Sequence, residues 1–212
     1  MKKNILSLII IIAIGITIFG FKTKANKTAN NEEEIATSYT VAKEYAVNTE
    51  SSIIEWQGFK PTGSHKGTIN LKSGVISAKG NYVKSGSFII DMNSIAESNA
   101  NKRLEGHLKS ADFFDVTQFP TASFEITSLE EKDGNKILSG NLTLKGVTNP
   151  VSFTVSLTQH DNELTLTSNV FTIDRSKWNV RYGSKSFFDD LKDKFINDDI
   201  ELKITVKVNK KS

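Results

Sequence analysis

The sequence contains no cysteine, and only three histidines, three prolines and two tryptophans among its 212 residues. The absence of cysteine excludes disulfides, thiol catalysis and cysteine-ligated zinc or iron–sulfur sites. The histidines, His65, His107 and His160, stand far apart and show neither HxH nor HExxH spacing. A zinc site would need three or four ligands converging from separate strands. We therefore expect surface or capping imidazoles, with no metal and no cofactor.

The chain also lacks an excess of charge of either sign once its N-terminal part is set apart. Of 27 basic and 24 acidic residues, residues 1–42 hold five lysines and three glutamates, which leaves 22 basic and 21 acidic residues in 43–212. A nearly neutral domain with interspersed charges lacks the basic footprint of a nucleic-acid-binding protein. We predict no nucleic-acid partner.

Catalytic motifs are missing as well. No GxSxG, SxxK or glycine-rich phosphate loop follows a strand-like run. Acidic side chains near helix starts or on exposed faces suit helix capping better than acid–base catalysis. This applies to the five aspartates that stand close enough together to be imagined as pairs: Asp112, Asp115, Asp189, Asp190 and Asp193. We predict no catalytic residue and no enzymatic activity.

A long apolar run is present at the N-terminus, where two lysines precede residues 5–21. This order is typical of an export signal, and the run also reaches the ~17-residue lower limit of a membrane span. We predict a protein exported to the periplasm or the cell exterior. Residues 1–25 are expected to be either a cleaved signal peptide or a retained anchor that contacts the membrane. Residues 26–42 are polar without a sustained period, which indicates a flexible tether.

From residue 43 onward, apolar residues recur with a period of two, as in strands with one buried face. The clearest runs are separated only by short turns such as Asp133-Gly134 and Asp161-Asn162, which predicts an antiparallel meander. These strands are expected near residues 121–130, 136–145, 150–158 and 163–173, before a last strand from Ile200 to Val208. Their predicted inward positions include Leu138, Leu142, Leu144, Val151, Phe153, Val155 and Leu157.

In all, about eight or nine strands with one apolar face are expected in a single domain, residues 43–212. A sheet of that size tends to close into a barrel or split into a sandwich. Closure leaves no exposed edge. The predicted fold class is therefore all-β with helical inserts, as a single antiparallel β-barrel of about eight strands.

Two stretches interrupt the strand pattern with helical spacing. Leu104, Leu108 and Ala111 fall on one side of a short helix that leads into a cluster of aromatic residues and ends before Pro120. Residues 184–196 repeat Phe187, Leu191 and Phe195 at i, i+4 and i+8, with Ser184 or Ser186 available as N-cap. We expect both helical inserts to cover an end of the barrel as lids.

Three sequence blocks resemble the YceI-like lipid/polyisoprenoid-binding family. They are DMNSI at 91–95, HLKSADFFDVTQFPTASFE at 107–125 and LSGNLTLKGVTNPV at 138–151, and the resemblance spans roughly residues 43–209. It implies an extended, lipocalin-like antiparallel barrel that encloses an apolar tunnel for an isoprenoid chain. The family is exported in many bacteria and is not known as an enzyme class.

We therefore predict a carrier that sequesters a long-chain isoprenoid or other lipid. The residues expected to line the tunnel or form its lid are Trp56, Phe88, Ile90, Leu104, Leu108, Phe113, Phe114, Phe124, Leu142, Leu144, Phe153, Trp178, Phe187 and Phe188. The basic cluster nearest an insert, available to a headgroup, is Arg175, Lys177 and Arg181. Two alternatives stay open: a membrane-tethered structural or interaction barrel whose core is filled by its own side chains, and a hydrolase of lipid-like substrates.

Overall fold

The computed structural model describes residues 42–79 and 82–210. The predicted signal peptide or anchor (1–25) and all but the last residue of the predicted tether (26–42) lie outside the described residues. The elements are β1 (Lys43–Val47), β2 (Ile53–Lys60), β3 (Gly63–Lys79), β4 (Tyr82–Glu97), α1 (Lys102–Lys109), β5 (Thr121–Lys132), β6 (Asn135–Leu144), β7 (Val147–His160), β8 (Glu163–Ser168), β9 (Phe171–Asp174), the 3-10 helices η1 (Arg175–Trp178) and η2 (Lys192–Lys194), and β10 (Asp199–Lys210).

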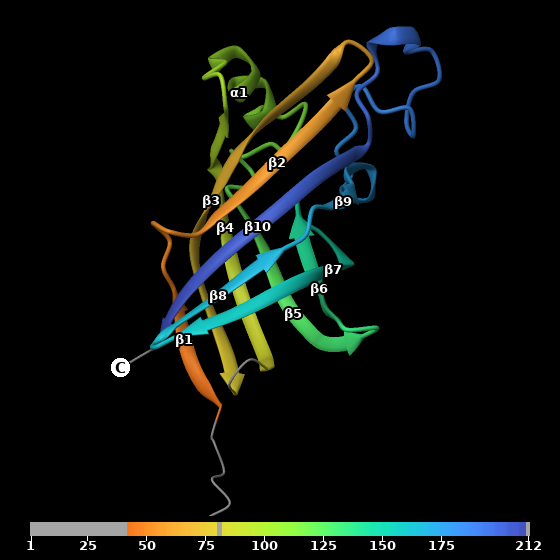
Figure 1. The fold of residues 1–212 in the computed structure, drawn as a ribbon. Coiled ribbons are helices and arrows are strands. Elements are labelled where there is room, and N and C mark those ends of the chain that lie inside the picture. Colours follow the sequence, from red (N-terminus) through yellow and green to blue (C-terminus); the bar gives the residue numbers. More distant parts are fainter. Residues whose placement is uncertain (1–41, 80–81, 211–212) are drawn as a thin grey trace, which may run out of the picture. The chain divides into compact units, whose positions relative to one another are not determined.

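Eight strands form a closed antiparallel ring in the order β10-β2-β3-β4-β5-β6-β7-β8, and β8 pairs with β10 to complete it (Figure 1). The two remaining strands continue the line of a ring strand. β1 lies past the start of β2 and pairs with both β10 and β3. β9 lies past the end of β8 and pairs with β10. The predicted antiparallel barrel of eight strands is confirmed. The run predicted as one strand at 163–173 is two strands, β8 and β9.

A buried serine lies at each of the two breaks along β10, where its neighbour changes from one strand to the next. Between β1 and β2, the Oγ of Ser52 accepts a hydrogen bond from the N–H of Lys207 at 2.9 Å and donates to the carbonyl of Lys207 at 3.3 Å. After β8, the Oγ of Ser168 accepts from the N–H of Ile204 at 2.8 Å. These hydroxyls replace missing backbone partners, so β10 stays paired across both interruptions.

Along most strands, every second side chain points into the barrel. At a β-bulge this alternation shifts by one residue. On β5, Ala122, Phe124 and Ile126 are buried, while the residues on the other face are exposed or half-buried. A register shift between Ile126 and Ser128 then brings Leu129, not residue 128, to the inside. A bulge adds one residue to a strand, so the side chains beyond it change faces.

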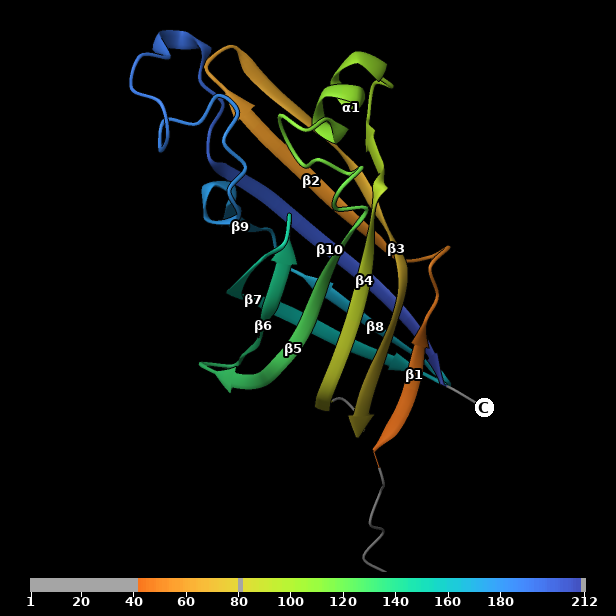
Figure 2. The same ribbon diagram turned by 180° about the vertical axis from the view of Figure 1, so that it is seen from behind.

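The two ends of the barrel differ in how they are filled. The closed end is formed by Tyr45, Ile76, Val83, Leu164 and Val208, which are at most 2% exposed. These side chains come from β1, the end of β3, the start of β4, β8 and the end of β10, and they pack against one another as core. Figures 1 and 2 show β1 and the β7–β8 hairpin at this end, opposite α1.

The two predicted inserts lie at the other end, called the α1 end here (Figure 2). The β4–β5 connection (residues 98–120) contains α1, as predicted. The β9–β10 connection (residues 175–198) contains no α-helix, so the second predicted helix is wrong. Lys192 has a left-handed backbone, with φ of 47°, and Phe187 and Phe188 are 38% and 48% exposed. The left-handed residue interrupts any continuous helix here, and the expected apolar face is only partly buried.

Candidate functional site

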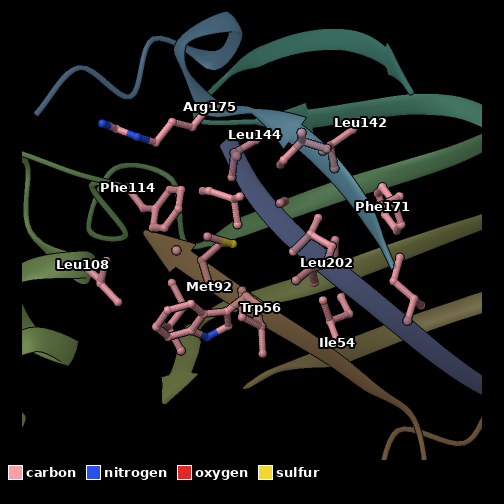
Figure 3. A pocket seen from close by; sticks show the side chains of 18 of the residues that line it. Ile54, Trp56, Met92, Leu108, Phe114, Leu142, Leu144, Phe171, Arg175 and Leu202 are labelled. Atoms are coloured by element: carbon pink, nitrogen blue, oxygen red, sulfur yellow. The ribbon is translucent and has the colours of Figure 1, made fainter. Parts of the chain in front are cut away.

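A cavity of about 250 Å³ lies inside the barrel at the α1 end, and every strand of the ring contributes to its mostly apolar lining. Period-two alternation produces this lining. On β10, the four alternate residues Ile200, Leu202, Ile204 and Val206 all face the cavity. Figure 3 shows Leu202, with Ile54 and Trp56 of β2, pointing into the same space.

Four phenylalanines form an aromatic wall along one side of the cavity: Phe88, Phe124, Phe153 and Phe171. Their ring centroids are 6.4 Å apart for Phe88 and Phe124, 5.8 Å for Phe124 and Phe153, and 4.1 Å for Phe153 and Phe171. Such ring pairs contribute about 0.5–1.5 kcal/mol each beyond the area that they bury. These ring contacts therefore help to stabilise the wall.

Two glycines allow large aromatic side chains to lie flat on the sheet. A Cβ on Gly140 would come within 2.2 Å of the Phe124 ring, and one on Gly67 within 2.8 Å of Trp56 and 1.9 Å of the Ala96 carbonyl. Contacts under 3 Å cannot form without a shift of the neighbouring atoms. Glycine at these positions therefore sets how closely Phe124 and Trp56 approach the barrel wall.

Buried carboxylates fix the β4–β5 connection over the cavity. Glu97, at the end of β4, accepts hydrogen bonds from the N–H groups of Asn99 at 2.7 Å and Asn101 at 3.3 Å. Glu105, on α1, accepts from the N–H of Glu97 at 3.1 Å and from Lys102 Nζ at 2.8 Å. The two carboxylates therefore join the end of the strand to the first turn of the helix.

The ionised forms of both carboxylates are stabilised. Burial alone would raise the pKa of Glu97, but hydrogen bonds from the main chain of Asn99 and Asn101, the Asn99 side chain and His65 outweigh it and lower the pKa. The pKa of Glu105 is lowered by its hydrogen bonds from Lys102 and from the Glu97 N–H, against a smaller opposing effect of burial.

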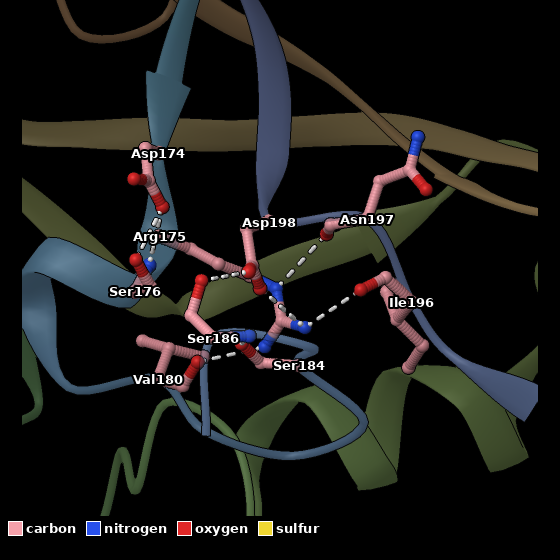
Figure 4. Close-up of polar contacts among 9 residues, drawn as sticks. All are labelled: Asp174, Arg175, Ser176, Val180, Ser184, Ser186, Ile196, Asn197 and Asp198. Carbon is pink, nitrogen blue, oxygen red and sulfur yellow. Dashed lines mark hydrogen bonds and ion pairs between the residues drawn. The ribbon is translucent and has the colours of Figure 1, made fainter. Parts of the chain in front are cut away.

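A buried guanidinium fixes the β9–β10 connection (Figure 4). Arg175 donates to the carbonyls of Asn197 at 3.1 Å, Val180 at 2.8 Å and Ile196 at 3.1 Å, and it pairs with Asp198 Oδ1 at 3.3 Å. Burial lowers the pKa of Arg175, and Asp198 and Asp174 oppose this effect. Arg175 lines the cavity, but most of its donors already hold backbone carbonyls, so it is poorly placed to bind a headgroup.

The two connections also touch each other. The Arg175 guanidinium lies 5.2 Å from the centre of the Phe113 ring, and the His107 and Tyr182 rings meet edge to face at 4.4 Å. Lys145 of the β6–β7 turn donates to the Phe113 carbonyl at 2.8 Å. Both connections therefore form one cover over the α1 end, stabilised by cation–π, ring and hydrogen-bond contacts.

Two polar atoms that are buried at the cavity have no hydrogen-bond partner within the described residues: Trp56 Nε1 and His107 Nε2. Neither of the other two histidines is alone: His65 Nδ1 lies 3.6 Å from Glu97, and the exposed His160 lies 3.1 Å from Asp161.

Eleven of the fourteen residues predicted for the tunnel or its lid line the cavity: Trp56, Phe88, Ile90, Leu104, Leu108, Phe113, Phe114, Phe124, Leu142, Leu144 and Phe153. The other three lie elsewhere. Trp178 is 1% exposed and donates from Nε1 to the Leu142 carbonyl at 3.0 Å, which supports β6 from outside the cavity. Phe187 and Phe188 are partly exposed on the β9–β10 connection, and Phe187 stacks under Arg181 at 4.9 Å.

Sequence reasoning missed several lining residues, among them Ile54, Phe171 and Leu202. The regular alternation of β10 would have found Leu202, since every inward residue from Ile200 to Val206 faces the same space. The role of Arg175 had no comparable signal, because its partners are main-chain carbonyls of residues 180, 196 and 197.

Within residues 42–79 and 82–210, no group of three or more His, Asp or Glu side chains is arranged to hold a metal. None of the helices in this described part has the length and apolarity needed to cross a bilayer. The lining of the cavity is itself mostly apolar, with few polar side chains, which is typical of sites that bind small molecules.

Comparison with known proteins identifies relatives of this fold. A family model of the YceI-like domain matches residues 45–208. Protein YceI of Salmonella arizonae is 40% identical over 68 residues, which is 32% of this chain and 35% of that protein. The aligned segment thus spans about a third of the length of the curated relative.

Two solved structures share the architecture. Burkholderia cenocepacia BcnA superposes with a TM-score of 0.62 at 20% identity, covering 76% of this chain and 98% of that chain. A polyisoprenoid-binding domain from Saccharophagus degradans, implicated in plant cell wall breakdown, superposes with a TM-score of 0.61 at 15% identity, covering 79% and 98%. At these identities the likeness establishes the fold alone.

Proposed function

The chain belongs to the YceI-like domain family, and from that premise we propose that its barrel binds and sequesters one long apolar molecule of the polyisoprenoid or related lipid type. The observation that carries the proposal is the cavity at the α1 end, lined by every strand of the ring and by the aromatic wall. The description of the Saccharophagus degradans domain as polyisoprenoid-binding supports the ligand class.

Burial of hydrocarbon supplies the binding free energy. Each CH₂ group removed from water contributes about 0.8 kcal/mol. A chain of ten or more carbons therefore gains enough to offset the several kcal/mol lost when the two molecules associate. No polar anchor is needed for the chain itself. The mechanism is passive: the barrel supplies the apolar surface, the β4–β5 and β9–β10 connections cover it, and no bond is made or broken.

We also propose that the protein acts outside the cytoplasm, either free or attached to the membrane by residues 5–21. The two lysines followed by an apolar run support this location. The intact mass of the protein isolated from its native cells tests it. A mass short by about the first 25 residues supports a cleaved signal, and the full-length mass in the membrane fraction supports an anchor. Recovery of full-length protein in the cytosolic fraction would contradict export.

Organic extraction of the purified full-length protein, followed by mass spectrometry, tests ligand binding. We expect a co-purifying prenyl or acyl lipid, and saturable binding of a fluorescent prenyl or fatty-acyl probe after the protein is stripped of lipid. No extractable lipid together with no probe binding would overturn the proposal. It would favour a structural or interaction barrel instead.

A further inference from the structure

The β9–β10 connection exposes several large apolar side chains at the α1 end. Of the six large hydrophobic side chains that are exposed in the described part of the chain, three lie within seven residues of this connection. They are Tyr182, Phe187 and Phe188, called the aromatic patch here, and none of them lines the cavity. Single exposed apolar residues are normal, but a group of large ones marks a site that contacts another molecule or a membrane.

Hydrogen bonds hold this turn in a defined conformation. The Ser184 carbonyl accepts from the N–H groups of Phe187 at 3.2 Å and Phe188 at 3.1 Å, and Ser184 Oγ accepts from the N–H of Ser186 at 3.1 Å. Ser186 Oγ donates to Asp198 Oδ2 at 2.7 Å, beside the buried guanidinium that fixes the connection (Figure 4). An ordered turn therefore keeps the two phenylalanines exposed.

Basic side chains lie next to the aromatic ones. The Arg181 guanidinium lies 4.9 Å from the centre of the Phe187 ring, and Lys185 Nζ lies 3.5 Å from the centre of the Phe195 ring. Apart from the ion pair at its base, the connection carries five exposed lysines and arginines against three exposed aspartates. Aromatic rings beside an excess of cations are typical of segments that lie in the interface of a membrane with anionic lipids.

The aromatic patch also adjoins the cavity. Ile196 and Asn197, at the end of the same connection, line the cavity, and the Asn197 N–H donates to the Phe59 carbonyl of the β2–β3 hairpin at 2.9 Å. The Ile196 N–H donates to the Gly183 carbonyl at 2.8 Å, within the segment that carries the patch. Figure 1 shows the connection, in blue, projecting beyond the strands at this end. A bilayer that contacts the patch would therefore lie over the cavity and not over the closed end.

We infer that the aromatic patch docks the α1 end onto a phospholipid bilayer that contains anionic headgroups. Phe187 and Phe188 enter the interface, and Arg181 and Lys185 pair with the phosphates beside them. This inference rests on the proposed function, because it assigns the route of the ligand. An apolar molecule passes between the bilayer and the cavity at this contact without crossing bulk water. The patch itself does not bind the ligand.

The absence of cysteine allows a single labelled position to test docking in the full-length chain. Phe188→Cys carries the environment-sensitive fluorophore nitrobenzoxadiazole, and Thr158→Cys, at an exposed position of β7, carries the same label as the control. Each protein is mixed with vesicles of equal parts phosphatidylglycerol and phosphatidylcholine, with and without spin-labelled lipid. We expect a blue shift and quenching at position 188 and neither at position 158. Raising the salt to about 0.5 M should weaken both signals.

A label at position 188 that stays in water would overturn the inference, whether or not the protein floats with the vesicles through its N-terminal part. It would leave the aromatic patch to a protein partner.

Transfer of a fluorescent prenyl or fatty-acyl probe from the barrel to the same vesicles provides a second readout. In Phe187→Ser/Phe188→Ser the transfer rate should fall about tenfold, which corresponds to roughly 1.4 kcal/mol of lost contact with the bilayer. Probe affinity without vesicles should stay at the wild-type value, because neither ring lines the cavity. Val170→Ser, which removes an exposed apolar side chain outside the connection, is the control and should change neither quantity.

The outcomes separate this inference from the proposed function. Equal transfer rates for the wild-type protein and the double variant would refute docking through the patch while sparing ligand binding. Absence of probe binding in the wild-type protein would refute the proposed function, and with it the assigned route, while the label at position 188 still reports whether the patch enters the bilayer.

Discussion

The two ends of the barrel are built from the same alternating strands, yet different interactions stabilise them. At the closed end, Tyr45, Ile76 and Leu164 are at most 2% exposed and pack as an ordinary apolar core. At the α1 end, the strands surround a cavity, and the chain above it is fixed by three ionised side chains, Arg175, Glu97 and Glu105.

This difference shows how a barrel can stay stable around a space for a guest. Side chains that face a cavity lose packing contacts on one side. Hydrogen bonds between buried charged groups and the backbone then hold the connections in place where side-chain packing is incomplete. We expect the closed end to respond to changes in side-chain volume and the α1 end to respond to changes in charge.

Removal of the guanidinium is expected to have the largest effect on unfolding. Arg175→Met leaves the carbonyls of Val180, Ile196 and Asn197 without their side-chain donor and Asp198 without its cation. Breaking a buried pair of this kind costs about 3–5 kcal/mol. Urea denaturation measures the loss. Lys177→Met, an exposed cation on the same 3-10 turn, is the control and should be nearly neutral. Equal effects of the two variants would contradict the role of Arg175.

A matched pair of leucines compares packing at the two ends. Leu164, at the closed end, is 1% exposed, and Leu202 faces the cavity. Leu164→Ala should lower the free energy of unfolding by about 2–5 kcal/mol. Leu202→Ala should cost clearly less in the lipid-free protein, because that side chain already borders empty space. If both substitutions cost the same in denaturant titrations, the interior is uniformly packed.

Backbone approach at the α1 end is tested by two glycines. In Gly67→Ala the new Cβ would lie 1.9 Å from the Ala96 carbonyl, so β3 and β4 must shift, at a cost of about 1–3 kcal/mol. Gly106→Ala on α1 meets nothing within 4 Å and should stabilise the helix by up to about 1 kcal/mol. Thermal and urea unfolding should therefore move in opposite directions for the two variants. A stabilising Gly67→Ala would show that this wall is not closely packed.

Acid should weaken the α1 end through its carboxylates. The pKa values of Glu97 and Glu105 are lowered in the folded protein, so their contribution is present above the ordinary value of 4.5 and is lost as pH falls through the lower folded values. The wild-type protein should be more stable than the double variant Glu97→Gln/Glu105→Gln at pH 7. The difference should shrink below pH 4.5. Urea denaturation of both proteins from pH 7 to pH 3 measures the difference in their free energies of unfolding. A difference that does not change with pH would exclude this linkage.

The barrel could be predicted from the sequence because its strands and turns are marked by short-range patterns. Alternation between inward and outward residues marks β10 and the β5–β8 meander, and short turns such as Asp133-Gly134 fix their antiparallel order. The same alternation pointed to part of the cavity lining, such as Leu142 and Phe153. It did not mark where the interior is hollow, because inward residues at the closed end, such as Ile76, follow the same pattern as Phe88 in the cavity.

Features set by tertiary contacts could not be predicted. The spacing of Phe187, Leu191 and Phe195 is helical, but the left-handed backbone at Lys192 and the hold of Arg175 on the carbonyls before β10 impose an irregular path. The break after β8 at Ser168 depends on a hydroxyl bonded to a strand that is distant in sequence. Such polar contacts between residues far apart in the chain produce no repeating pattern in the sequence.

A single residue of the cavity lining, Gly58, tests the central claim, that the ligand lies inside the α1 end. Gly58 lines the cavity, and a Cβ there meets nothing within 4 Å, so Gly58→Phe should fill the space with little effect on unfolding. Gln57→Phe, on the opposite face of β2, is the control. Titration with a fluorescent fatty-acyl or prenyl probe should show at least about a tenfold loss of affinity in Gly58→Phe and wild-type affinity in Gln57→Phe. Unchanged binding in a well-folded Gly58→Phe protein would place the ligand outside the barrel and contradict the account.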